Sequence, residues 1–188
     1  MIYRTLQNDI VTLRPIHHED RERLREAAKF DHVWTNTTLM NHYDEKLFNA
    51  WFALAFNNSQ GPSQKCFVFE KDGKLIGSSR YYGISEKEIS IGYTWISPSY
   101  WGTKVNPSIK YLMLNNVFEN GYERVFFHTD ILNLHSQAAI QKLGATFVKK
   151  TVADKIRPDG TLRDTMEYVI DQSKWPEIKE GLLKRINA

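Results

Sequence analysis

Hydrophobic residues recur with two different periods along the chain, and its first part predicts one strand followed by two helices. Residues 10–15 alternate apolar and polar side chains, as a half-buried strand does, and Pro15 ends the pattern. Asp44 is a typical N-cap residue for the second helix. The apolar faces of the two helices comprise Leu24, Ala27 and Ala28, and then Phe48, Trp51, Phe52, Ala55 and Phe56. We expect the aromatic face to lie in the core, with its end near a pocket.

The middle of the chain predicts three consecutive antiparallel strands. Residues 66–70, 74–83 and 88–97 are rich in β-branched and aromatic side chains, and the Asp-Gly turn at residues 72–73 joins the first two. From Pro107 the period becomes helical, and Gly121 ends that helix. Its apolar face consists of Ile109, Leu112, Met113, Val117 and Phe118.

A strand at residues 124–129 follows this helix. A strand, a helix and a strand with this spacing indicate a crossover to a parallel neighbour. The remaining elements are a helix at 133–143, strands at 145–153 and 163–170 around a turn at 156–162, and a closing helix at 175–186. No linker or repeat interrupts this order, so residues 1–188 are expected to form one α+β domain with a short C-terminal helix. Its sheet of about seven strands should be mostly antiparallel, with a parallel pair at its centre.

Composition narrows the class of protein. Apolar residues make up 41% of the 188 residues and charged residues 25%, which suffices for a substantial core. The net charge of +3 is low for a nucleic-acid binder, and Cys66, as the only cysteine, excludes an intrachain disulfide. No segment has the run of about 18 apolar residues that a membrane span needs. We therefore expect a cytoplasmic protein that binds neither membranes nor nucleic acid.

The segment from Ile91 to Asn106 is the strongest candidate for a ligand site. A strand there runs into a short loop and then into a helix predicted to open with Asn106 as N-cap and Pro107 as first residue. The free N–H groups of a first helical turn attract anions, and Gly102 and Lys104 would add a close backbone approach and a cation. The segment therefore predicts a pyrophosphate site, although an ordinary capped helix has the same residues. The chain has neither a P-loop nor a Rossmann fingerprint.

Three segments in this order resemble the GNAT superfamily of acetyl-CoA-dependent N-acetyltransferases, specifically its branch of ribosomal-protein N-terminal acetyltransferases. IGYTWISP is similar to the splayed fourth strand of that family, WGTKVN to its pyrophosphate loop and NLHSQAAIQKLGA to its cofactor helix. The resemblance runs from Val11 to about Ile170. It implies a central parallel pair opened into a V, helices on both faces of the sheet, and acetyl-CoA as co-substrate.

The resemblance also implies where the coenzyme binds. Pantetheine would lie along residues 92–96, and the pyrophosphate over residues 102–106. The implied cofactor-binding residues are Tyr93, Thr94, Trp95, Ile96, Trp101, Gly102, Thr103, Lys104, Val105, Asn106 and Asn133.

The chain departs from the family pattern at three places. Lys104 and Asn106 stand where the family's loop has small residues. Ser90 replaces a glutamate common in relatives, and Ile140 replaces the tyrosine that many members use as general acid. Ser136 matches the serine that takes the place of this tyrosine in the ribosomal-protein branch.

The implied reaction is transfer of an acetyl group to a primary amine. An α-amine, with a pKa near 8, loses its proton more readily than a lysine, so a site without a strong base favours a protein N-terminus as acceptor. Ser136 and Asn133 are the candidate catalytic residues: the serine would protonate the departing thiolate, and the asparagine would orient pantetheine or a water. A backbone N–H of Thr94 or Trp95 would stabilise the oxyanion.

No general base is assigned. Asp130 and Glu88 are candidates acting through water, and His128 and His135 are alternatives. The six histidines lack metal-binding spacing, so no metal is expected. A polyamine, an aminoglycoside or an amino acid is an alternative acceptor, and a non-catalytic acyl-CoA sensor is an alternative function. A homodimer is left open.

Overall fold

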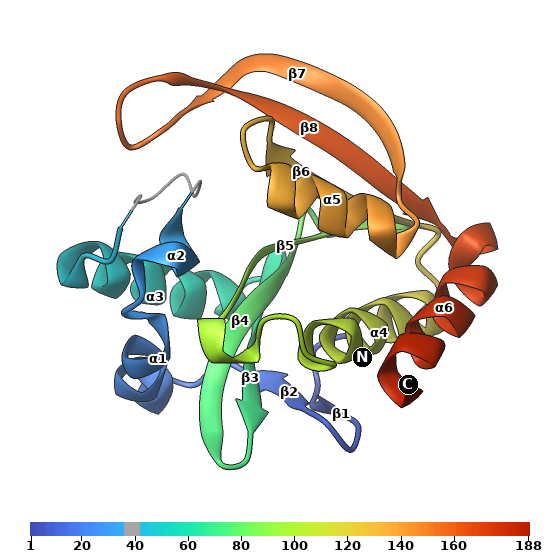
Figure 1. The fold of residues 1–188 in the computed structure, drawn as a ribbon, viewed down its shortest axis with the longest axis horizontal. Helices are drawn as coiled ribbons and strands as arrows, with labels where there is room; N and C mark the ends of the chain where they lie inside the picture. The colour runs from blue at the N-terminus through green and yellow to red at the C-terminus, as the bar shows by residue number, and fades with distance from the viewer. Residues whose placement is uncertain (36–41) are drawn as a thin grey trace.

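One eight-stranded sheet runs through the molecule in the computed structural model, which describes residues 1–35 and 42–188 (Figure 1). The strand order is β1-β2-β3-β4-β5-β6-β8-β7, and β5 and β6 form the parallel pair while the other neighbours are antiparallel. The strands are β1 (Leu6–Gln7), β2 (Thr12–Pro15), β3 (Gln64–Lys71), β4 (Lys74–Tyr82), β5 (Glu88–Ile96), β6 (Arg124–Asp130), β7 (Thr146–Ile156) and β8 (Leu162–Asp171). The predicted α+β fold with a central parallel pair is confirmed.

Helices cover both faces of this sheet, as predicted. Figure 1 shows α1 and α3 on one side of β3 and β4, and α4 and α6 on the other. The helices are α1 (Arg21–Ala28), α2 (Asp31–Trp34), α3 (Glu45–Gln60), α4 (Val105–Glu119), α5 (Leu134–Leu143) and α6 (Trp175–Asn187), with single 3-10 turns at residues 18–20, 98–100 and 172–174.

Successive side chains of a strand point to opposite faces of the sheet, so the protein has two hydrophobic cores, one on each face of the sheet. On β3, Cys66 and Val68 point to the face of α1 and α3, and Phe67 and Phe69 point to the other face. The aromatic face of α3 is buried in the first of these cores, so the prediction that it packs inside is confirmed. Cys66 is fully buried, and burial raises the pKa of its thiol to about 11, which makes it a packing residue.

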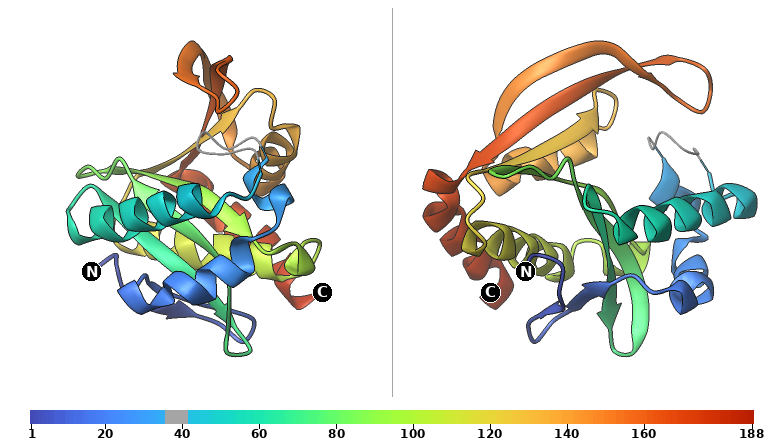
Figure 2. Two further views of the ribbon diagram at one scale, coloured as in Figure 1. Left: turned by 90° about the vertical axis from the view of Figure 1, so that its left-hand side faces the viewer. Right: turned by 180° about the vertical axis from the view of Figure 1, so that it is seen from behind.

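Two short elements were not predicted from the sequence, and one strand is longer than predicted. The two-residue strand β1 and the four-residue helix α2 are too short to leave a periodic signal. Strand β7 extends to Ile156 instead of ending near residue 153, because it pairs with β8 up to Leu162. The resulting β7–β8 hairpin arches away from the rest of the sheet above α5 (Figures 1 and 2).

The contact between β4 and β5 is irregular where the site begins. Two residues of β5, Tyr93 and Thr94, lie opposite the single residue Ser79 of β4, which is a β-bulge. Tyr93 has a φ of 54°, a left-handed conformation that few non-glycine residues adopt. Beside the bulge, Gly77 lies so close to β5 that a Cβ on it would be 2.3 Å from the carbonyl oxygen of Trp95. This close approach of two backbones fixes the position of β5.

Gly77→Ala tests that contact. The added methyl group must displace a strand backbone, so we expect the free energy of unfolding to fall by about 2–3 kcal/mol. The matched control is Gly181→Ala in α6, where nothing lies within 4 Å of the new Cβ. The control should gain about 1 kcal/mol from helix propensity. Urea denaturation measures both, and equal stability of the two variants would contradict the close approach.

Candidate active site

The parallel strands β5 and β6 pair at three positions and then separate. Glu88, Ile89 and Ser90 pair with Arg124, Val125 and Phe126, and no pair is described from Ile91 or Phe127 onward. On its other edge β6 remains paired with β8 up to Asp130, so β6 stays in the sheet while β5 diverges from it. The splayed pair implied by the sequence is therefore present, and it leaves a V-shaped gap between two strand edges.

The bulge residues form one side of this gap. The hydroxyl oxygen of Thr94 lies 2.7 Å from that of Ser79 and accepts a hydrogen bond from the Lys110 ammonium at 3.2 Å. Tyr93 is half exposed at 51%. In contrast, the side chains of Trp95 and Ile96 are buried in the two cores, so only their backbone groups can face a cofactor.

The loop after β5 is held by its own side chains. Trp101 donates a hydrogen bond from its indole N–H to the carbonyl oxygen of Ile96 at 2.8 Å, and its ring stacks with His135 of α5 at 6.4 Å between centroids. Gly102 has a φ of 71°, a left-handed conformation that favours glycine; nothing lies within 4 Å of a Cβ built there, so the predicted close approach to a ligand stays a prediction. The Thr103 hydroxyl donates to the carbonyl of Tyr100 at 2.7 Å. The loop is thus anchored at the end of β5 and contacts α5 near its start.

The helix after this loop begins two residues earlier than predicted. α4 starts at Val105 with Lys104 at the N-cap position, and neither Lys104 nor Asn106 caps it by a side-chain hydrogen bond. Instead the Thr103 hydroxyl accepts from the N–H of Val105 at 3.3 Å. Pro107 fits as the third helical residue because the first turn leaves its N–H groups unpaired in any case. Val105 is buried, whereas the side chains of Lys104 and Asn106 are exposed.

The start of α5 contains the two predicted catalytic residues. Asn133 is the N-cap, and its carbonyl oxygen accepts from the N–H of Ser136 at 3.0 Å. The amide nitrogen of Asn133 donates no hydrogen bond within the described residues, so it is available to a ligand. Ser136 is half-buried, and its hydroxyl makes no hydrogen bond within the described residues. Stacking of Trp101 on His135 brings this helix start beside the loop.

Lys110 is a site residue that the sequence analysis missed. Its ammonium lies within the V, next to Thr94 of β5 and 5.7 Å from the ring centroid of Phe127 on β6. Burial lowers the pKa of this ammonium to about 8. Its spacing of four residues from Asn106 places both on one helix face, and that spacing was the signal available in the sequence.

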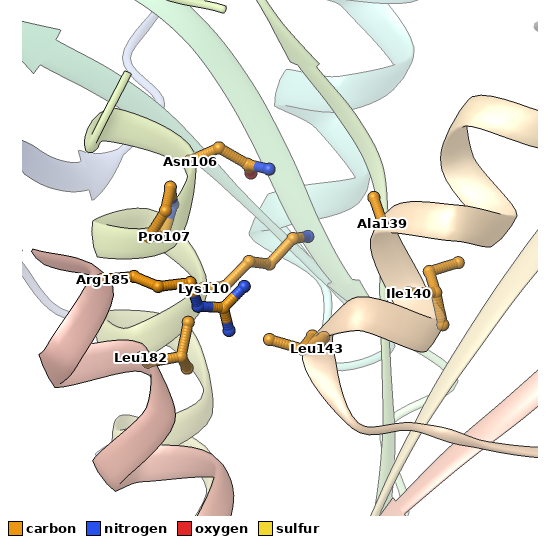
Figure 3. A pocket seen from close by; sticks show the side chains of 8 residues that line it. All are labelled: Asn106, Pro107, Lys110, Ala139, Ile140, Leu143, Leu182 and Arg185. Atoms are coloured by element: carbon orange, nitrogen blue, oxygen red, sulfur yellow. The ribbon is translucent and has the colours of Figure 1, made fainter. Parts of the chain in front are cut away.

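A small cavity of about 60 Å³ lies beside Lys110, between α4, α5 and α6. Figure 3 shows Lys110 and Arg185 pointing into the space between α4 and α5, with Ala139, Ile140 and Leu143 on the opposite side. Neither cation has an ion-pair partner within the described part of the chain. Two cations without an ion-pair partner make this cavity suitable for an anionic ligand.

Two of the candidate bases are held in ion pairs. Asp130 is bound by two nitrogens of Arg157 at 2.7 and 2.8 Å. Burial acts to raise the pKa of Asp130, but hydrogen bonds from Arg157 and the N–H of Leu132 outweigh it, so that its pKa is lowered. Glu88 pairs with Arg124 at the closed end of the strands. The histidine candidates lie apart: His135 is exposed against Trp101, and His128 is hydrogen-bonded on both ring nitrogens.

Comparison with known proteins defines the class. The sequence model of the acetyltransferase (GNAT) domain matches residues 11–146. The chain therefore belongs to the GNAT acetyltransferase family, whose members use acetyl-CoA. The splayed strands and the cationic loop fit that coenzyme. No curated protein matches the chain.

Solved structures share the fold at low sequence identity. A GCN5-related N-acetyltransferase from Brucella melitensis has a TM-score of 0.87 at 20% identity, covering 97% of this chain and 85% of that one. RimJ of Mycobacterium smegmatis, in complex with CoA-disulfide, has a TM-score of 0.76 at 20% identity, covering 96% and 90%. A Salmonella typhimurium acetyl transferase that modifies the N-terminal serine of ribosomal protein L7/L12 has a TM-score of 0.75 at 14% identity, covering 87% and 96%.

Within residues 1–35 and 42–188, no three His, Cys, Asp or Glu side chains are grouped as metal ligands would be. In the same part of the chain, no helix combines the length and apolarity that crossing a bilayer requires.

The lowered pKa of the half-buried Lys110 predicts a specific pH dependence of stability. The pKa of the Lys110 ammonium is about 8 in the folded chain and has its ordinary value of 10.5 in the unfolded chain. Between pH 8 and pH 10.5 the unfolded chain therefore binds more protons than the folded chain. Stability of the wild type relative to Lys110→Met should therefore rise as the pH increases from 8 to 10.5. Urea denaturation at both ends of this range measures the difference. The control Lys184→Met removes an exposed lysine, and an identical profile for both variants would contradict the lowered pKa of Lys110.

Proposed function

We propose that this protein transfers the acetyl group of acetyl-CoA to a primary amine, and that the acceptor is the N-terminal α-amine of a protein. The observation that carries the proposal is the V between β5 and β6, which has unpaired strand edges inside and a cationic loop at one end. A pantetheine arm carries amide groups that can hydrogen-bond to such an edge as an added strand would. Family membership and the shared fold support this interpretation.

The coenzyme would lie in an extended path across the site. Pantetheine would occupy the gap beside Thr94, displacing or contacting the Lys110 ammonium that now bridges it. The diphosphate would rest on the N–H groups of residues 102–106, where the first turn of α4 leaves donors unpaired. Lys104 and Arg185 would supply charge to its phosphates. Arg185 adds a contact from α6, outside residues 11–146 matched by the family model.

The chemistry then requires few side chains. The neutral amine nitrogen attacks the thioester carbonyl carbon, the C–N bond forms and the C–S bond breaks. The proton that the nitrogen loses replaces the one that Ser136 gives to the departing thiolate. A backbone N–H of Thr94 or Trp95 would bind the oxyanion. The Ser136 hydroxyl would donate to the departing thiolate, and Asn133 would hold the pantetheine through its free amide nitrogen. Positioning of the two reactants supplies a large share of such a rate.

The acceptor assignment rests on protonation. Asp130 and Glu88 are paired with arginines, so neither is free to deprotonate a lysine-like amine. An α-amine, with an ordinary pKa near 8, is partly neutral at physiological pH and depends less than a lysine on a base that removes its proton. The Salmonella protein of the same fold modifies an N-terminal serine, which supports this class of acceptor.

Coenzyme binding tests the first part of the proposal. We expect isothermal titration calorimetry to show acetyl-CoA binding that Arg185→Met and Lys104→Met each weaken by about tenfold, because each removes a charge-assisted phosphate contact. The matched control is Lys184→Met, since Lys184 is exposed on α6 and pairs with Glu180 at 2.7 Å. The control should bind as the wild type does. Equal affinity of the wild type and all three variants for acetyl-CoA would contradict the proposed phosphate site.

Turnover on defined acceptors tests the second part. Peptides with a free α-amine should be acetylated, and the same peptides with a blocked α-amine and a free lysine should react at least tenfold more slowly. Ser136→Ala should lower kcat by about 10- to 100-fold with little change in KM, because a thiolate donor acts in the transition state. Ser173→Ala, at an exposed serine, is the control. Acetyl-CoA binding without turnover on peptides, polyamines, aminoglycosides or amino acids would instead identify an acyl-CoA sensor.

A further inference from the structure

Three polar side chains from three strands form a hydrogen-bonded chain over the place where β5 and β6 separate. The phenol oxygen of Tyr82 on β4 lies 2.9 Å from Nδ1 of His128 on β6. Nε2 of His128 lies 3.0 Å from a carboxylate oxygen of Glu167 on β8. All three side chains are half-buried. Their strand positions place them on the sheet face of α1 and α3, opposite the face that carries Lys110.

Gly92 allows this chain to cross β5. Tyr82 reaches His128 over Gly92, where a Cβ would lie 2.9 Å from a ring carbon of Tyr82 and 3.2 Å from its phenol oxygen. Gly92 comes two residues after Ser90, the last residue of β5 that pairs with β6. It also directly precedes the bulge at Tyr93. The phenol oxygen therefore lies over the place where the two strands separate, next to the proposed thioester site.

The two hydrogen bonds define a direction for proton movement. A carboxylate only accepts, so Nε2 of His128 must donate to Glu167. Nδ1 then accepts from the Tyr82 hydroxyl, and the lone pairs of the phenol oxygen remain to accept from a ligand in the gap. A carboxylate behind an imidazole also stabilises the imidazolium when it forms.

We propose that Tyr82, His128 and Glu167 form a proton relay that deprotonates the acceptor ammonium, an inference that rests on the proposed function. The ammonium proton passes to the phenol oxygen of Tyr82 as the phenol proton passes to Nδ1 of His128. The products are a neutral amine, an unchanged phenol and an imidazolium paired with the Glu167 carboxylate. Tyr82 contacts the substrate, and His128 and Glu167 act through it. The relay supplies the base that the paired Asp130 and Glu88 do not.

The surrounding groups are compatible with this role. Burial raises the pKa of the Tyr82 phenol, so it carries protons without becoming a standing phenolate. The ring of Tyr93 contacts it edge-on at 5.2 Å, and Arg80 lies over Tyr93 at 4.7 Å. On the far side, the Lys149 ammonium is 3.9 Å from Glu167, and the Arg163 guanidinium lowers the Tyr82 pKa electrostatically without reversing the effect of burial.

The pH dependence of kcat/KM tests the relay, measured with the acceptor peptide that the wild type acetylates. We expect His128→Gln and Tyr82→Phe each to lower kcat/KM by about 10-fold at pH 7, where only about a tenth of an α-amine with a pKa near 8 is neutral. The loss should shrink to less than threefold at pH 9.5, where an α-amine is already neutral. Affinity for acetyl-CoA by calorimetry should stay within twofold. His18→Gln, at an exposed histidine remote in sequence from the site, is the control.

A readout independent of turnover accompanies the kinetics. Nitrogen-15 NMR of the histidines should show His128 as the Nε2–H tautomer at neutral pH, with an Nδ1 resonance that shifts in Tyr82→Phe. A loss of kcat/KM of the same size at every pH, no loss at pH 7, or the opposite tautomer would overturn the relay while leaving the acetyl transfer in place. A wild type that binds acetyl-CoA but acetylates no amine at any pH would overturn both.

Discussion

The end of hydrogen bonding between β5 and β6 is the constraint on which the rest of the structure depends. Strand pairing satisfies backbone N–H and C=O groups, and the pairing of these strands stops after three residue pairs. Gly77 holds the next part of β5 against β4, and the bulge at residues 93–94 turns it away from β6. Beside the strand edges left between them, the Lys110 ammonium donates to the Thr94 hydroxyl.

Helices α4 and α6 place unpaired N–H groups and cationic side chains beside this gap. α4 begins at the end of the loop that follows β5, so its unpaired N–H groups lie beside the gap. α5 begins after β6 and meets the same loop through Trp101 and His135. α6, from the end of the chain, brings Arg185 to the space between them (Figure 3). Three segments distant in sequence thus meet around one cavity lined by Lys110 and Arg185.

The proposed coenzyme-binding groups and the proposed proton relay lie on opposite faces of the sheet. Lys110 and Arg185 lie on the face of α4, α5 and α6, and the chain of Tyr82, His128 and Glu167 lies on the face of α1 and α3. Because the V opens between β5 and β6, it connects the two faces. A donor held on one face and an acceptor held on the other would therefore meet where the strands separate.

The sequence by itself determined the α+β class, the meander, the parallel pair and the loop at residues 101–106, because periodicity, turns and glycines are local signals. It did not determine the start of α4, the half-buried cation Lys110, the contribution of Arg185 or the relay through Tyr82. Each of these depends on distances between residues far apart in the chain: Tyr82 and His128 are 46 positions apart, and His128 and Glu167 are 39 apart. Only the packing of the strands brings such side chains together, and no periodic pattern records it.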